Sequence, residues 1–274
     1  MTRRRPKPIK VSNALRFYHE VLGLDHLQYG LWEDEPRTLE GLKSAQARYT
    51  EYLHGWIPGG VKTVLDVGCG TGAAAARLKL QGYEVEGLSP DPHQEALFAT
   101  RVGSRFHLSR FQDFEPTRVY DLALMSESAQ YIQLEKFFPS VLRVAPGGHL
   151  LVSDYFVVDE NGGPLARSGH SLEVFLREAE SHEVALEREE DITDRVKPTL
   201  DIARDLLQNR LQPALEIFND SLQTRRPYVH RIVRWLARKK LNELQDLDRM
   251  VDSAEFARVK RYKIFLFRVP RKDA

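Results

Sequence analysis

Several features that would point to a particular environment or partner are scarce in this sequence. It holds a single cysteine, Cys69, so no disulfide can form within the chain, and this favours a cytoplasmic location. The 40 lysines and arginines nearly balance the 39 aspartates and glutamates, and a formal net charge of +1 leaves no strong field to attract nucleic acid or a membrane surface. No apolar run is long enough to cross a bilayer, and no apolar signal core follows the basic start of the chain.

Metal-ligand patterns and repeats are also missing. The nine histidines are scattered, and no pair has ligand spacing with cysteine or carboxylate support, so no metal site is expected. There is no internal repeat and no low-complexity tract, and nothing indicates an oligomeric state. A length of 274 residues with 42% hydrophobic residues suits one large α/β domain with an insertion, or two small domains.

What the chain does have is an apolar strand that runs directly into a glycine-rich turn. Residues 64–72 read VLDVGCGTG, and an alanine-rich helical segment follows at once. Glycine is needed where φ is positive or where a ligand lies against bare main chain. In α/β folds such a unit lies at the carboxyl edge of the sheet, where ligands bind. The third glycine comes too early for G-x-G-x-x-G, and no Lys-Ser/Thr pair follows, so neither phosphate-binding fingerprint is met.

Strands and helices alternate through the middle of the chain. The expected strands are Thr63–Val67, Glu84–Leu88, Arg105–Leu108, Asp121–Met125 and His149–Phe156. This alternation predicts a mostly parallel sheet with helices on both faces, which is a Rossmann-like α/β fold. A sixth strand is expected at His182–Glu187 and a final one at Tyr262–Phe267.

Helical segments flank this core on both sides. Residues 10–60 predict one helix from Ser12 or Asn13 to Gly23 and a second from Leu39 to Trp56. Apolar residues at three- and four-residue steps between positions 229 and 247 predict another amphipathic helix. We therefore divide the chain into a helical lid at 1–60, a core at 61–190 and 261–274, and a helical insertion at 191–260. The lid and the insertion are expected to roof a substrate pocket.

The run at 64–72 closely resembles motif I of the class I S-adenosylmethionine (SAM)-dependent methyltransferases. Residues 141–150, VLRVAPGGHL, resemble the same family where a helix turns back into the fifth strand. Residues 29–32, YGLW, with 38–40, TLE, and 45–46, AQ, resemble cyclopropane fatty acid synthases and the small-molecule methyltransferases near them. This resemblance runs weakly over residues 17–156. It implies an antiparallel last strand, SAM as cofactor, and methyl transfer to a small organic acceptor through an N, O or C nucleophile.

The resemblance also implies a set of cofactor contacts. Asp66 would order the glycine turn and attract the ammonium of SAM, or it caps the turn alone. Ser89 stands where the family places an acid for the ribose hydroxyls, and Asp91 is either that acid or the N-cap of the next helix. The expected cofactor residues are Asp66, Gly68, Cys69, Gly70, Gly72, Ser89, Asp91, Gln112, Asp113, Ser126 and Tyr29.

The loop after the fourth expected strand should lie beside the methyl group. Glu127 in this loop would orient an amine or cap a helix. Tyr29, Trp32 and Tyr131 are candidates to face the sulfonium as cation–π partners. An OH or NH acceptor needs a base near the operating pH, and the candidates are His26, His170, Glu127 and Asp154. The expected substrate contacts are Trp32, Gln130, Tyr131 and Asp154.

The same loop bears on the type of reaction. Gln130 and Tyr131 stand near the Glu-His pair expected of cyclopropane synthases, and the lid holds no cysteine, so plain methyl transfer is favoured. The loop also lacks the Asn/Asp-Pro-Pro-Tyr/Phe element of enzymes that methylate nucleic-acid bases. The reaction needs alignment for an in-line displacement and the exclusion of water.

Two other functions stay open. Because no acid stands at position 89, the protein could bind SAM as a sensor or assembly partner without catalysis. A basic cluster between Arg225 and Lys240 would suit an RNA or protein methyltransferase, or it is the solvated face of an amphipathic helix. No nucleic-acid-binding module supports an RNA partner, so a small-molecule substrate is favoured.

Overall fold

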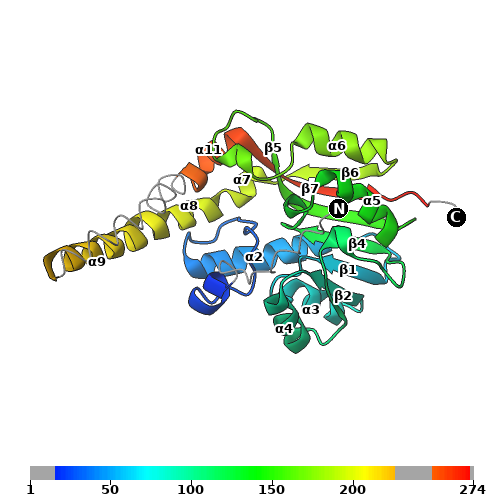
Figure 1. The fold of residues 1–274 in the computed structure, drawn as a ribbon, viewed down its shortest axis with the longest axis horizontal. Helices are drawn as coiled ribbons and strands as arrows, with labels where there is room; N and C mark the ends of the chain where they lie inside the picture. The colour runs from blue at the N-terminus through cyan, green and yellow to red at the C-terminus, as the bar shows by residue number, and fades with distance from the viewer. Residues whose placement is uncertain (1–15, 226–248, 272–274) are drawn as a thin grey trace, which may run out of the picture.

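The computed structural model describes residues 16–225 and 249–271, and a seven-stranded sheet forms its centre (Figure 1). The strand order is β3-β2-β1-β4-β5-β7-β6. The strands are β1 (Thr63–Val67), β2 (Glu84–Ser89), β3 (Phe106–Leu108), β4 (Leu122–Ser126), β5 (His149–Val157), β6 (Ala185–Asp191) and β7 (Lys260–Arg268). The first five strands pair in parallel, and β7 runs antiparallel to both β5 and β6. The predicted Rossmann-like methyltransferase fold with an antiparallel last strand is therefore confirmed.

The predicted limits of one strand differ from the observed limits by several residues. The sixth strand was expected at His182–Glu187, but β6 spans Ala185–Asp191 at the edge of the sheet. Nearly all of its side chains are exposed, so there is no apolar alternation to fix its limits. Strands β1, β4 and β5 carry runs of buried, mostly apolar residues, and the predicted limits of β1 to β5 fall within two residues of those observed.

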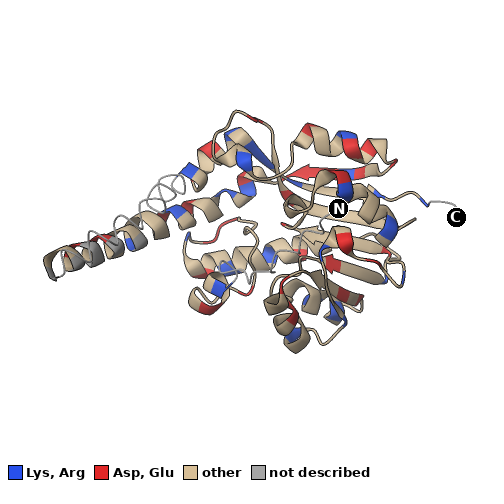
Figure 2. Ribbon diagram, in the orientation of Figure 1, with Lys and Arg blue, Asp and Glu red and all other residues tan. Residues whose placement is uncertain are grey.

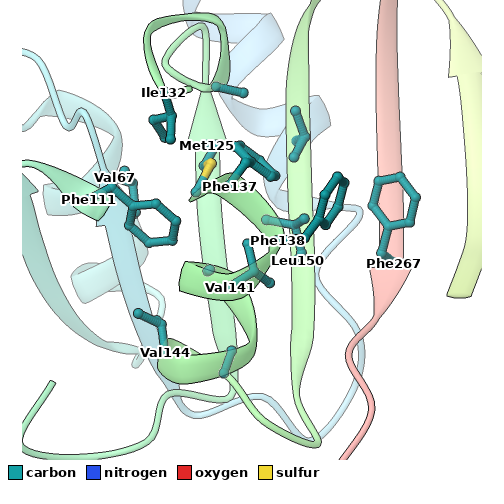
Figure 3. Close-up of a cluster of buried hydrophobic side chains, with 14 of the residues drawn as sticks. Val67, Phe111, Met125, Ile132, Phe137, Phe138, Val141, Val144, Leu150 and Phe267 are labelled. Carbon is teal, nitrogen blue, oxygen red and sulfur yellow. The ribbon is translucent and has the colours of Figure 1, made fainter. Parts of the chain in front are cut away.

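Two hydrophobic clusters sandwich the sheet. On one face, α5 (Leu134–Val144) packs against the strands through Phe137 and Phe138 (Figure 3). On the same face, α6 (Leu172–Ser181) contributes Phe175. On the other face lie α2 (Leu39–His54), α3 (Ala73–Leu80), α4 (Pro92–Arg101) and α11 (Ser253–Val259). Burial on both faces explains why the central parallel strands β1, β4 and β5 are mostly apolar.

The segment before β1, where the lid is predicted, is only partly helical within the described residues. It contains a turn of π-helix, η1 (Phe17–Val21), an irregular stretch and the helix α2. Thr38 caps α2 by accepting a hydrogen bond from the backbone N–H of Gly41 at 3.1 Å. Four side chains of α2 are buried: Leu42, Ala45, Tyr49 and Leu53. The predicted start of the first helix, at Ser12 or Asn13, lies outside the described residues.

The insertion between β6 and β7 is helical, as expected. It contains α7 (Thr193–Val196), α8 (Pro198–Leu206), the π-helical turn η5 (Leu207–Leu211), α9 (Gln212–Arg225) and α11. In Figure 1, α8 and α9 extend away from the sheet as an arm. The basic cluster expected between Arg225 and Lys240 lies outside the described part of the chain, apart from the backbone of Arg225. No helix in the described ranges is long and apolar enough to span a membrane.

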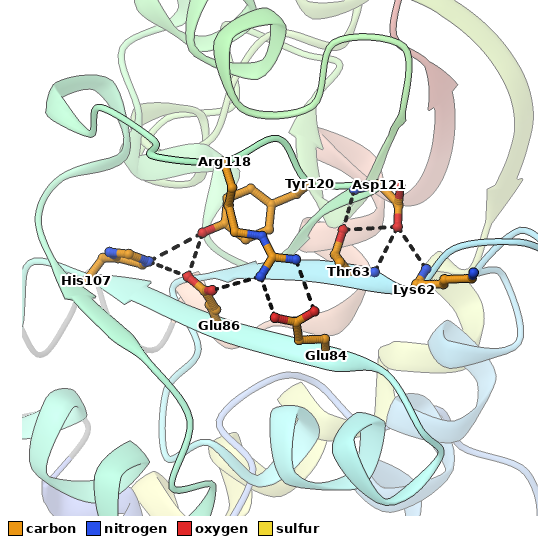
Figure 4. Close-up of polar contacts among 8 residues, drawn as sticks. All are labelled: Lys62, Thr63, Glu84, Glu86, His107, Arg118, Tyr120 and Asp121. Atoms are coloured by element: carbon orange, nitrogen blue, oxygen red, sulfur yellow. Dashed lines mark hydrogen bonds and ion pairs between the residues drawn. The ribbon is translucent and has the colours of Figure 1, made fainter.

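A cluster of polar side chains connects the loop before β4 to strands β2 and β3 (Figure 4). The Tyr120 hydroxyl donates to Glu86 Oε2 at 2.7 Å, and His107 Nε2 lies 2.6 Å from the same oxygen. Arg118 pairs with Glu84 as well as with Glu86. Burial raises the pKa of Glu86, but the contacts of Tyr120, His107 and Arg118 outweigh burial and leave it below the usual value.

Candidate functional site

A cavity of about 910 Å³ lies at the carboxyl ends of β1, β2 and β4. The glycine turn after β1 and the loop after β4 form its wall, and lid residues 25–29 and the inner face of α2 complete it. This edge is where open α/β sheets bind ligands. None of the described residues after position 155 lines the cavity, so the described part of the insertion does not contribute to this wall.

The glycine turn has the backbone that the sequence predicted. Gly68 has φ +77° and Gly70 has φ +56°, and both line the cavity together with Cys69. A Cβ atom at Gly68 would lie 2.5 Å from Ser128 Cβ, so no other residue fits there without a shift. Gly72 is different: it caps α3 with φ +77°, and a Cβ there would meet Val102 and Phe98 rather than the cavity.

Asp66 places a buried carboxylate against this turn. It is 4% exposed and lines the cavity. Burial raises the pKa of Asp66 to about 7, and its Oδ2 atom has no hydrogen-bond partner within the described ranges. A buried carboxylate without a partner is costly, and the ammonium of a bound ligand would relieve that cost. Asp66 and the bare backbone of the turn therefore fit the amino-acid end of SAM.

The end of β2 supplies the next part of the wall. Asp91 caps α4 by accepting from the backbone N–H of His93 at 2.9 Å, and Ser89 Oγ accepts from the backbone N–H of Asp91 at 3.2 Å. Both residues are buried and line the cavity. The N-cap interpretation of Asp91 is thus observed, which leaves its contact with a ribose as a proposal. Gln112 and Asp113, on the turn η2 (Phe111–Asp113), line the cavity as well.

The lid contacts the glycine turn directly. The Thr71 hydroxyl donates to the carbonyl of Asp25, and Arg101 reaches Thr71 Oγ1 at 2.9 Å and Asp25 Oδ1 at 2.5 Å. His26 lines the cavity, and its Nδ1 atom lies 3.4 Å from Thr50 Oγ1. Burial lowers the pKa of His26, so its imidazole is neutral near pH 7.

Glu127 is the carboxylate on the opposite wall. Its Oε1 atom accepts from the backbone N–H of Tyr29 at 2.7 Å and from the hydroxyl of Tyr262 at 2.6 Å. Burial raises the pKa of Glu127 to about 8, although these two hydrogen bonds act to lower it. Ser126, Gln130 and Tyr131, from the same loop, also line the cavity. A carboxyl group with such a pKa is suited to accept a proton near neutral pH.

Besides Gly72, three expected site residues lie outside the cavity wall. Trp32 is in a small apolar cluster and donates from Nε1 to Thr199 Oγ1 at 2.9 Å. His170 Nε2 lies 2.9 Å from the carbonyl of Ala129, and its ring stacks on Phe175. Asp154 is 1% exposed and accepts from the backbone N–H of Tyr155 at 2.8 Å and that of Gln130 at 3.2 Å. The surroundings of all three are protein, so they have packing and hydrogen-bonding roles.

Several residues in the site were not foreseen. Tyr18, Tyr49 and Tyr155 line the cavity, and Gln94 accepts a hydrogen bond from the backbone N–H of Gly70 at 3.1 Å. Tyr49 is one of several buried residues at helical spacing along α2. This spacing predicts that its side chain is buried, but not that it lines the cavity. No pattern in the sequence connects β7, which carries Tyr262, with the loop that holds Glu127.

Comparison with known proteins identifies the family. The model of the methyltransferase domain family matches residues 37–194, which is more than half of the chain. The chain belongs to this family. It therefore contains a methyltransferase domain over residues 37–194. Methyltransferase GfsG of Streptomyces halstedii is 32% identical over 149 residues, which are 48% of this chain and 52% of that protein. The chain thus matches about half the length of this relative.

Solved structures share the fold over nearly the whole chain. The [4+2]-cyclase SpnF has a TM-score of 0.66 at 20% identity and covers 98% of this chain and 100% of its own. Geranyl diphosphate C-methyltransferase from Streptomyces coelicolor A3(2), solved with S-adenosyl-L-homocysteine, has a TM-score of 0.67 at 14% identity, with coverage of 95% and 94%. The cyclopropane synthase MmaA2 from Mycobacterium tuberculosis has a TM-score of 0.66 at 17% identity, with coverage of 94% of this chain and 94% of its own.

Proposed function

We propose that this methyltransferase acts on a small organic acceptor with a hydroxyl or an amine as its nucleophile. This nucleophile gives up a proton in the reaction, and Glu127 receives that proton. The observation that carries the proposal is the position of Glu127. It lies in the wall of the cavity that holds the glycine turn, and its pKa of about 8 suits a general base. Two hydrogen bonds fix its Oε1 atom.

SAM supplies an electrophilic methyl carbon bound to a sulfonium. In the reaction, a bond forms between the acceptor oxygen or nitrogen and this carbon, and the carbon–sulfur bond breaks. Its electron pair stays on sulfur and yields S-adenosylhomocysteine, while the acceptor proton passes to the Glu127 carboxylate. Asp66 would hold the ammonium group, and the backbone at Gly68 and Gly70 would support the amino-acid end. The lid excludes water and keeps the reacting atoms aligned.

The size and lining of the cavity favour a small acceptor. A volume of about 910 Å³ lies within the range of small-molecule pockets, which runs from roughly 300 to 1,000 Å³. Tyr18, Tyr29, Tyr131 and Tyr155 supply aromatic surface around Glu127, and Gln130 supplies an amide. We assign acceptor contacts to Gln130 and Tyr131, and none to Trp32 or Asp154. A structural neighbour named for geranyl diphosphate is in keeping with a small-molecule acceptor.

Replacing the carboxylate by its amide tests the proposal. Hydroxylated and amine-bearing small molecules are screened for S-adenosylhomocysteine release from SAM by the wild-type protein. On any acceptor found, Glu127→Gln should lower turnover by about 10²-fold or more, with SAM affinity unchanged, because general-base catalysis contributes on the order of 10²–10⁴. Glu86→Gln is the matched control and should keep its turnover. Glu86 belongs to the polar cluster around Tyr120 and does not line the cavity. A fully active Glu127→Gln protein would contradict the proposed role.

A further inference from the structure

Glu127 has a backbone conformation that few non-glycine residues adopt. Its φ is +55°, and in the described ranges only Glu183 shares this feature among residues other than glycine. The left-handed region costs roughly 1–2 kcal/mol for an L-residue. Such strain persists only where the surroundings fix it, and it gathers at functional sites. The backbone N–H of Glu127 donates to the carbonyl of Ser153 at 2.8 Å, which ties the residue to β5.

Both donors to the Glu127 carboxylate reach the same oxygen. The backbone N–H of Tyr29 and the hydroxyl of Tyr262 lie 2.7 and 2.6 Å from Oε1. No described residue donates a hydrogen bond to Oε2. The carboxylate is therefore held by one oxygen, and the other is the atom available to a ligand in the cavity.

Tyr262 is itself held firmly. It is fully buried in β7, and its ring centroid lies 5.5 Å from that of Tyr29 and 6.2 Å from that of Tyr49. Its hydroxyl is 3.0 Å from that of Tyr49, which in turn donates to Ser153 Oγ at 2.7 Å. Burial first, and then the charge of Glu127, keep the pKa of Tyr262 well above its usual value. The phenol therefore stays protonated and remains a hydrogen-bond donor.

We infer that Tyr262 is a positioning residue for this methyltransferase: it holds Glu127 Oε1, so that Oε2 faces the acceptor and receives its proton. The inference rests on the proposed role of Glu127. Because the phenol donates to the ionised carboxylate, it also lowers the pH at which Glu127 becomes a base. The backbone N–H of Tyr29 binds the same oxygen, so the lid also helps to hold this carboxylate.

The test is Tyr262→Phe, which removes the hydroxyl and keeps the ring. Tyr120→Phe is the matched control, because the Tyr120 hydroxyl also donates to a buried carboxylate, at 2.7 Å, but at the other edge of the sheet. Glutamate labelled with ¹³C at the side-chain carboxyl gives the pKa of Glu127 by NMR, with the signal assigned from Glu127→Gln. We expect Tyr262→Phe to raise this pKa by about 1 unit, since a hydrogen bond to a charged group contributes about 1.5 kcal/mol or more. Tyr120→Phe should leave it unchanged.

Turnover on an identified acceptor gives the second measurement. Tyr262→Phe should move the acid limb of the kcat profile to higher pH, so that kcat falls about tenfold at pH 7 and recovers above pH 9, with little change in KM. If Tyr262→Phe does not fold, 3-fluorotyrosine at position 262 is used. This stronger donor should lower the pKa of Glu127.

The outcomes separate the two claims. An unmoved Glu127 pKa and an unmoved pH profile in the position-262 variant would overturn the positioning role, even if Glu127→Gln is inactive. Full activity of Glu127→Gln would instead overturn the proposed function.

Discussion

At the scale of single residues, burial raises the pKa values of two carboxylates on opposite walls of one cavity, but the two have different hydrogen-bond partners. Burial raises the pKa of Asp66 to about 7 and that of Glu127 to about 8. Glu127 has two hydrogen-bond donors from the protein, whereas Asp66 Oδ2 has none among the described residues. Asp66 is therefore suited to hold a cation of the ligand, and Glu127 to take up a proton.

Asp66→Asn should raise the stability of the ligand-free protein and lower its affinity for SAM. The change removes a buried charge, so the melting temperature of the ligand-free protein at pH 8 should rise by a few degrees. SAM affinity should fall by on the order of tenfold or more, because the partner of the ammonium is lost. In the wild type, affinity should increase from pH 6 to 8 as Asp66 ionises. Calorimetric titration and thermal melts check both effects, and an equal SAM-induced shift in the two proteins would contradict this role of Asp66.

Gly68→Ala should abolish SAM binding, because a Cβ atom there would meet Ser128 Cβ at 2.5 Å on the cavity wall. Gly82→Ala is the matched control. Gly82 also has positive φ, +95°, but its Cβ would meet nothing within 4 Å and it lies outside the cavity. Both variants pay roughly 1–2 kcal/mol of backbone strain. Urea unfolding measures this loss of stability, which both variants should share. Only Gly68→Ala should also lose SAM binding.

The sequence predicts site residues correctly where they lie at the end of a strand or directly after it. Asp66, Gly68 and Gly70 follow directly from β1, and the structure places all three in the cavity wall. Tyr262 donates to Glu127 across 135 positions of the chain, so no local pattern reveals that contact. His170 is a candidate by its residue type and Trp32 by its place in the segment 29–32, and only the packing of their surroundings shows that they lie elsewhere.

At the scale of elements, the parallel strands and the lid carry different signals in the sequence. The strands are buried on both faces, so their apolar runs predict them well. The lid stretch 24–32 has no regular structure, and its place is set by contacts such as Arg101 with Asp25 and Gln46 Nε2 with the carbonyl of Gln28 at 2.7 Å. The sequence indicates Tyr29 and Trp32 as candidate site residues in this stretch, but not the partners that hold it in place.

SAM should slow amide hydrogen exchange in the lid. The lid residues 25–29 and residues 68–71 line one cavity, so a ligand between them should protect both segments. Helix α6, which packs on the opposite face, is the internal control and should show no change. Exchange measured by mass spectrometry with and without SAM tests this, and protection of α6 equal to that of the lid would contradict a local closure.

At the scale of the whole molecule, the acidic groups buried near the cavity should shape stability against pH. The pKa values of Asp66, Glu127 and Asp154 are raised to about 7, 8 and 7 by burial. Because each would ionise more easily in the unfolded chain, the unfolded state binds fewer protons and stability falls as pH rises. Buried histidines with lowered pKa values act in the opposite sense below about pH 6.5, and Lys260, with a pKa of about 8, acts above that value.

The melting temperature of the ligand-free protein should therefore fall between pH 6.5 and 8. SAM should reverse most of this fall, because it supplies a cationic group to the ionised cavity. Thermal melts over this range, with and without SAM, measure both effects. A melting temperature that rises from pH 6.5 to 8 without ligand would contradict the raised pKa values.

The most direct test of the central claim is a crystal structure of the protein with S-adenosylhomocysteine. We predict that the ammonium lies within hydrogen-bond distance of Asp66 Oδ2, that the amino-acid end lies against Gly68 and Gly70, and that the sulfur faces the wall that carries Glu127. S-adenosylhomocysteine bound elsewhere, or in this cavity with its sulfur turned away from Glu127, would contradict it.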